Sequence, residues 1–248
     1  MQFIAKFLGL LLACFASAHA DEVQVAVAAN FSAPMHKLAL AFARETGHKA
    51  VISVGSTGKF YAQIRNGAPF AVLLSADDET PTRLAQEGLA LANTQFTYAK
   101  GQLVLWSAQP DVVDAQGQVL QGKLPGRLAL ADPKLAPYGL AATQALAKLG
   151  LSDRLKPNWI VGENIAQTYQ FVKTGNAALG FVALSQVMSD GRLSSGSAWV
   201  LPASLYSPIR QDAIVLKAAE HQPAARALMA FLRSDSARQL MASYGYLN

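Results

Sequence analysis

The stretch VISVGSTGKFYAQIRNG, residues 51–67, joins an apolar run of β-forming residues directly to a helical pattern. Its first four residues read as a strand, and Phe60 and Ile64 share one face of a helix that ends at Gly67. Between strand and helix lies GSTGK, residues 55–59, which looks like half of a phosphate-binding loop. A strand that runs directly into a helix is the building unit of α/β architecture.

The GSTGK turn fits neither a nucleotide loop nor a serine-hydrolase elbow. In the motif GxxxxGK[ST] the first glycine would fall on Ser53 and the final hydroxyl on Phe60. The elbow GxSxG fails because Ser56 directly follows a glycine. What remains is a helix N-terminus with free N–H groups and the hydroxyls of Ser56 and Thr57, which suits an anion. A simple helix cap formed by either hydroxyl is the alternative.

The same strand-to-helix arrangement recurs in three further segments. They are VAVAANFSAPM, residues 25–35, ADPKLAPYGLAA, residues 131–142, and VGENIAQTYQFV, residues 161–172. The helix starts fall near Asn30, Tyr138 and Ile165. Together with the GSTGK turn, the sequence offers four helix N-termini, two in each half, that can converge on one small anion.

Short apolar runs alternate with helical patterns along the whole chain, which predicts an α/β fold. Two successive strand–helix units near the N-terminus predict a right-handed parallel sheet. A change of register near residues 98–101 starts a new strand in GQLVLWS, and SPIRQDAIVL, residues 207–216, reads as a later strand before two closing helices. Residues 189–197 read as a polar turn. Each half of the chain therefore predicts an α/β lobe. Two such lobes that face each other form a cleft at the carboxyl ends of their strands.

Residues 1–20 read as a secretory signal. A short apolar segment follows Lys6, and Ala18-His19-Ala20 is a small-x-small cleavage site. Leu11 to Cys14 resembles a lipoprotein box, so lipid anchoring through Cys14 is the minor alternative. Cleavage after Ala20 leaves no cysteine, which excludes a thiol nucleophile and thiolate metal sites.

The charge pattern argues against a nucleic-acid partner. The formal net charge of +5 falls to +4 without Lys6, and no basic run or basic–aromatic interleaving occurs. The remaining histidines, His36, His48 and His221, lack metal-ligand spacing, so we expect no metal centre. No later run of about eighteen apolar residues occurs, and we expect a soluble exported protein.

A few charged and aromatic residues allow other interpretations. Asp77 and Asp78 are candidates for acid–base work, although such a pair more often caps the following helix. Lys59 reads as part of a solvated helix face. Tyr244 and Tyr246 are candidates for iron ligands, but no carboxylate or histidine is placed to complete that site, and we read them as packing residues.

From Glu22 to Asn248 the chain resembles the periplasmic molybdate-binding proteins, the extracytoplasmic receptors of molybdate ABC importers. The resemblance rests on the four segments above, on their continuations to residues 77 and 187, and on YAKGQLVLWS, residues 98–107. It implies a two-lobed type 2 periplasmic binding-protein fold, an α/β fold whose ligand cleft lies between two mixed sheets flanked by helices. Residues 21–100 with 206–248 would form lobe 1, and residues 101–205 would form lobe 2.

The resemblance also implies the function. The ligand would be molybdate or tungstate, held by neutral donors, with no cofactor, no bound metal other than in the oxyanion, and no enzymatic activity. The protein would be a periplasmic monomer that docks on the transmembrane subunits of an ABC permease.

Residue by residue, the ligand positions of the family match Asn30, Ser56, Thr57, Tyr138 and Ile165, with Tyr138 and Ile165 donating through their backbone N–H groups. Some relatives add a tyrosine hydroxyl where this chain has Ala183. The missing contact must come from elsewhere, and the Tyr138 side chain is one candidate.

Four alternatives compete with this interpretation. A phosphate receptor would need an acceptor such as Asp132, while a sulfate receptor would differ only in cavity size. An amino-acid receptor would pair an acid such as Glu163 with a loop arginine, which no loop offers. An exported enzyme would use Asp77 or Asp78.

Overall fold

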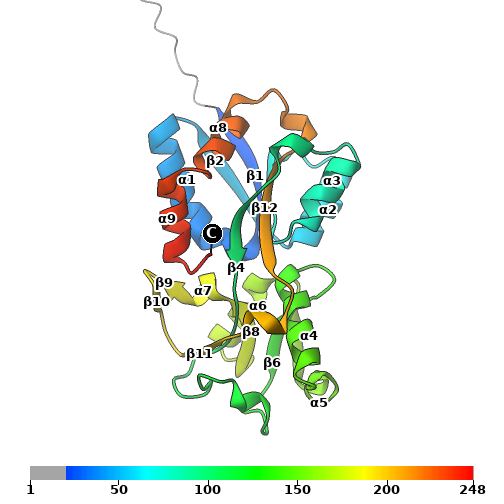
Figure 1. Ribbon diagram of the computed structural model, residues 1–248, viewed down its shortest axis with the longest axis vertical. Coiled ribbons are helices and arrows are strands. Elements are labelled where there is room, and N and C mark those ends of the chain that lie inside the picture. Colours follow the sequence, from blue (N-terminus) through cyan, green and yellow to red (C-terminus); the bar gives the residue numbers. More distant parts are fainter. Residues whose placement is uncertain (1–20, 248) are drawn as a thin grey trace, which may run out of the picture.

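The computed structural model describes residues 21–247, which form two α/β lobes joined end to end (Figure 1). The expected signal segment and Cys14 lie outside the described residues. Among residues 21–247, no helix has the length and apolar character needed to cross a membrane.

The first lobe is built on a five-stranded mixed sheet. Its strand order is β2 (Lys49–Gly55), β1 (Glu22–Ala28), β3 (Val72–Leu74), β12 (Ile209–Val215) and β4 (Phe96–Gly101). The strand β1 pairs in parallel with β2 and β3, as the two strand–helix units predict, whereas β12 pairs antiparallel with β3 and β4.

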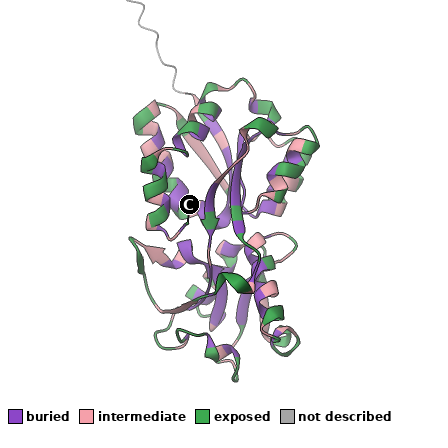
Figure 2. Ribbon diagram, viewed as in Figure 1, coloured by how far each residue is buried: buried purple, intermediate pink, exposed green. Residues whose placement is uncertain are grey.

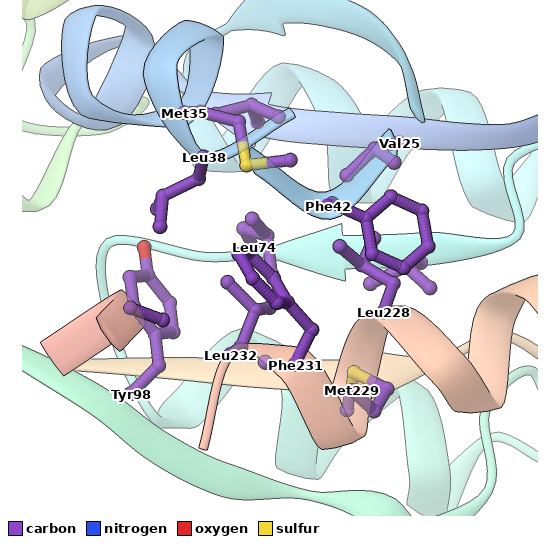
Figure 3. Close-up of a cluster of buried hydrophobic side chains, with 14 of the residues drawn as sticks. Val25, Met35, Leu38, Phe42, Leu74, Tyr98, Leu228, Met229, Phe231 and Leu232 are labelled. Carbon is purple, nitrogen blue, oxygen red and sulfur yellow. The ribbon is translucent and has the colours of Figure 1, made fainter. Parts of the chain in front are cut away.

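Helices cover both faces of this sheet because side chains alternate along β1. Val25 points to α1 (Ser32–Thr46), α8 (Pro223–Phe231) and α9 (Asp235–Ser243), while Ala26 points to α2 (Thr57–Arg65) and α3 (Glu79–Gln86). Figure 3 shows the first of these cores, where Leu38 of α1 and Leu228 of α8 lie on either side of Leu74. The central strands of the sheet are buried, the edge strand β2 is partly exposed, and the outer faces of the helices are exposed (Figure 2).

The second lobe has a five-stranded mixed sheet of its own. Its order is β11 (Ser197–Val200), β5 (Leu103–Ser107), β8 (Leu179–Ala183), β6 (Leu128–Ala131) and β7 (Trp159–Gly162). The helix α4 (Pro137–Lys148) packs on one face and α6 (Ile165–Lys173) on the other. The remaining short elements are α5 (Ser152–Leu155), α7 (Leu184–Val187), the ribbon β9 (Met188–Ser189) with β10 (Arg192–Leu193), and the 3-10 turns η1 (Ala29–Phe31), η2 (Ala92–Thr94), η3 (Gln118–Leu120), η4 (Lys156–Asn158), η5 (Ala203–Leu205) and η6 (Lys217–Ala219).

Two stretches connect the sheets (Figure 1). Gln102 separates β4 from β5, and residues 201–208 lead from β11 to β12. The lobe limits expected from the sequence, 100/101 and 205/206, fall at the end of β4 and at the end of η5.

The α/β architecture with two mixed sheets is confirmed, but two details differ from the sequence prediction. The strand predicted in GQLVLWS is preceded by a separate strand, β4, which belongs to the other sheet. The polar region 189–197 is not only a turn, since it contains β10 and parts of β9 and β11. β9 and β10 have two residues each and β11 has four, so they are too short to show an apolar periodicity that would predict them.

Candidate functional site

A small cavity lies between the lobes, at the carboxyl ends of β1, β2, β3, β6 and β7. The five residues predicted from the sequence all line it, and they come from both lobes: Asn30, Ser56, Thr57, Tyr138 and Ile165. The other lining residues are Ala28, Ala29, Gly55, Ala76, Ala136, Pro137 and Asn164. No acidic or basic side chain is among them.

Helix starts supply the cavity with backbone donors. The helices α2, α4 and α6 begin at Thr57, Pro137 and Ile165, and η1 leads into α1. Across residues 21–247, the N–H groups of Asn30, Thr57, Tyr138 and Ile165 donate to no acceptor of the chain. First-turn N–H groups carry the partial positive charge of a helix, so four such groups around one cavity favour an anion there.

Two hydroxyl groups add to these donors. The Ser56 Oγ atom is buried without any hydrogen-bond partner, and Ser56 makes no side-chain capping bond to α2. Thr57 Oγ1 accepts a hydrogen bond from the Ala76 N–H at 3.0 Å, which leaves its own proton uncommitted. The helix-cap alternative therefore does not describe Ser56, whose hydroxyl costs about 1–3 kcal/mol while it stays buried and unpaired.

The Asn30 side chain is held from behind the cavity. Its Nδ2 atom donates to Gln211 Oε1 at 2.8 Å and to the Tyr246 hydroxyl at 2.9 Å, so both amide hydrogens are engaged. The Tyr246 hydroxyl also lies 3.0 Å from the Asn30 carbonyl oxygen and 3.0 Å from Ser185 Oγ. Interpreting Tyr246 only as a packing residue was incomplete: it packs against Phe31, but its hydroxyl belongs to this polar network.

The Tyr138 side chain joins the same network. Its hydroxyl accepts from Gln211 Nε2 at 3.0 Å, and its proton has no acceptor among the described residues. Ala183, the position of the tyrosine found in some relatives, is fully buried and does not line the cavity. Burial raises the pKa of Tyr98, Tyr138 and Tyr246, which keeps the three phenols neutral. Sequence reasoning missed Gln211, which lies between Arg210 and Asp212 and so does not stand out as a polar residue of β12.

The two aspartates proposed for acid–base work lie in a neighbouring groove rather than in the cavity. Asp77 accepts from the Thr80 N–H at 2.9 Å, so it caps the start of α3, and burial raises its pKa. Asp78 pairs with Arg210, with 3.5 Å between Oδ2 and Nε. Asp77 also accepts from the hydroxyls of Ser75, at 3.0 Å, and Thr80, at 3.1 Å.

The acids that the rival receptors would need are also directed elsewhere. Asp132 Oδ1 accepts from the Lys134 N–H at 2.9 Å. Glu163 lies 2.7 Å from Lys59 Nζ in an ion pair between the lobes, with both side chains about half exposed. Lys59 therefore lies on a solvated face, as expected, but it also contacts the opposite lobe. Residues 21–247 contain no cluster of three or more histidine, cysteine, aspartate or glutamate side chains that could hold a metal ion.

Comparison with known proteins agrees with this geometry. Residues 23–247 match the family of bacterial extracellular solute-binding proteins. The molybdate-binding protein ModA of Azotobacter vinelandii is 56% identical over 95% of this chain and 93% of its own length, and that of Rhodobacter capsulatus is 45% identical over 98% and 95%. The structure of an Azotobacter vinelandii periplasmic molybdate-binding protein superimposes with a TM-score of 0.89, at 41% identity over 91% of this chain and 99% of that one. The chain therefore belongs to the bacterial extracellular solute-binding protein family and has its two-lobed periplasmic binding-protein fold.

Proposed function

We propose that this protein captures molybdate, and equally tungstate, outside the cytoplasm and delivers it to an ABC permease. The observation that carries the proposal is the unpaired, buried Ser56 hydroxyl beside four unengaged N–H groups in a cavity without charged side chains. The names of the two ModA relatives point to the same ligand.

The donor set suits a fully deprotonated tetrahedral oxyanion. Such a dianion offers only acceptors, and the four unengaged N–H groups of the cavity are donors. Phosphate is partly protonated near neutral pH and would need an acceptor, but Asp132 does not line the cavity. Sulfate has the charge and shape of molybdate, so discrimination between the two rests on the size of the cavity.

The anion binds the open form, and the lobes then close around their two connections. In the closed arrangement the Gly58 N–H donates to the Leu135 carbonyl at 2.9 Å, and Ser185 Oγ donates to the Asn30 carbonyl at 2.8 Å. Both bonds join one lobe to the other. They stabilise the closed form once the anion has accepted hydrogen bonds from the N–H groups of both lobes.

The remaining parts of the proposal concern the setting. The protein acts in the periplasm after removal of its signal segment, as a monomer, without a cofactor and without catalysis. Its partners are the oxyanion and the transmembrane subunits of the permease.

A thermal-shift screen tests the proposal. Molybdate and tungstate should raise the melting temperature strongly at concentrations where sulfate and phosphate do little, because a ligand that binds only the folded state stabilises it in proportion to its affinity. An equal shift with sulfate would contradict the selectivity, and no shift with any oxyanion would contradict the function.

A further inference from the structure

A buried glutamine on β12 connects the two lobes behind the cavity. Gln211 has no exposed surface. Its Oε1 atom accepts from Asn30 Nδ2 at 2.8 Å and from the Tyr98 hydroxyl at 3.0 Å, both in the first lobe. Its Nε2 atom donates to the Tyr138 hydroxyl, in the second lobe, at 3.0 Å. One side chain therefore holds a lining residue from each lobe.

The backbone around Gln211 is shaped to make these contacts. The pairing between β12 and β4 shifts after Gln211, which faces Ala99, while the next pair joins Asp212 to Thr97. Tyr98 is the extra residue of this bulge, and a bulge redirects side chains locally. Gly101 lies beside the network: a Cβ atom there would be 2.1 Å from the Tyr138 hydroxyl and 2.5 Å from Gln211 Nε2. The bond between Gln211 and Tyr138 thus requires glycine at this point of β4.

We propose that Gln211 is a positioning residue for the anion site, which orients Asn30 and Tyr138 and makes their correct placement depend on closure of the lobes. Gln211 does not line the cavity, so it acts through these two residues. The inference rests on the proposed function. Opening the lobes separates Tyr138 from Gln211, so the bond between them opposes release of the ligand.

Gln211→Leu tests this role, because leucine keeps the apolar bulk and removes both polar atoms. Molybdate binding is measured by calorimetric titration and its release by stopped-flow fluorescence. Leaving Asn30 and Tyr138 without their buried partner should weaken affinity about tenfold or more. Most of the loss should appear as faster dissociation. Gln222→Leu is the matched control: its Nε2 donates to the Glu22 carbonyl at 2.7 Å, within the first lobe and at the end of β1 opposite the cavity, and its affinity should stay within about twofold of wild type.

Gln211→Glu adds a second test, the pH dependence of molybdate affinity, which would not change if Gln211 had only a structural role. The titratable groups that face this position are Tyr98 of β4 and Tyr138 of α4, with Tyr246 reached through Asn30, and burial keeps all three neutral. A protonated carboxyl reproduces the donor and acceptor of the amide, whereas a carboxylate adds negative charge behind the anion site. Molybdate affinity of this variant should therefore fall as pH rises from 5 to 8, while wild type stays flat.

The outcomes distinguish failure of the role assigned to Gln211 from failure of the proposed function. Wild-type affinity in Gln211→Leu, equal losses in Gln211→Leu and Gln222→Leu, or a flat pH profile in Gln211→Glu would each overturn the role of Gln211. Failure of the wild-type protein to bind any oxyanion would instead overturn the proposed function.

Discussion

Replacing Ser56 by alanine should separate affinity from stability. The Ser56 hydroxyl is buried, lines the cavity and has no partner in the protein. The change therefore breaks no bond within the folded chain. In the complex it removes one donor to a doubly charged ligand.

The expected loss of affinity follows from the one hydrogen bond to the ligand that the substitution removes. A hydrogen bond to a charged partner contributes about 1.5–3 kcal/mol. Its loss should raise the dissociation constant for molybdate roughly 10- to 160-fold. The free energy of unfolding of the ligand-free protein should not fall, because the hydroxyl lost is one whose burial is unfavourable in the closed form.

Calorimetric titration and thermal unfolding, each with and without molybdate, measure the two quantities. Ser107→Ala is the matched control with the opposite expectation. Ser107 is equally buried, but its Oγ donates to the Ala178 carbonyl at 2.7 Å, far from the cavity. That variant should lose stability and keep its affinity. A Ser56→Ala protein that melts lower and binds molybdate as wild type does would refute the reasoning, since Ser56 would then be a structural residue.

Further expectations concern Thr57 and pH. Thr57→Val should lower both affinity, by about 1.5–3 kcal/mol, and the melting temperature, because valine also deprives the Ala76 N–H of its acceptor; calorimetry beside a melting curve shows whether both change. Molybdate affinity should be flat between about pH 6 and 9, since no donor of the cavity titrates there; a tenfold change in calorimetric titrations would indicate an ionisable ligand. The free energy of unfolding should decline above about pH 10. Burial raises the pKa of Tyr98, Tyr138 and Tyr246 above the ordinary value of 10.0, so these tyrosines ionise at lower pH in the unfolded chain than in the folded one. Denaturant titrations at pH 8 to 11 measure this decline.

The sequence predicted the helix starts around the cavity because their positions are encoded locally. A strand that passes through small residues into a helix places its free N–H groups at the strand's carboxyl end, and this pattern marks Thr57, Tyr138 and Ile165. The same reasoning could not distinguish a capping hydroxyl from an unpaired one. That distinction depends on what surrounds Ser56 in three dimensions.

The hydrogen-bond network behind the cavity could not be predicted from local sequence patterns, for a different reason. Asn30 bonds to Gln211 and Tyr246, which lie 181 and 216 residues further along the chain. Periodicity describes which face of a strand or helix is buried, but it does not state which distant side chains meet there. A buried glutamine and a C-terminal tyrosine therefore read as unremarkable until the fold brings them together.

A crystal structure of the molybdate complex, with the metal located by its anomalous scattering, tests the central claim most directly. The claim predicts one molybdenum peak in the cavity between the lobes. Its oxygens should lie within about 3 Å of Ser56 Oγ and of the N–H groups of Thr57, Tyr138 and Ile165. A peak beside a lysine or arginine outside the cavity, or none at saturating molybdate, would contradict capture by neutral donors.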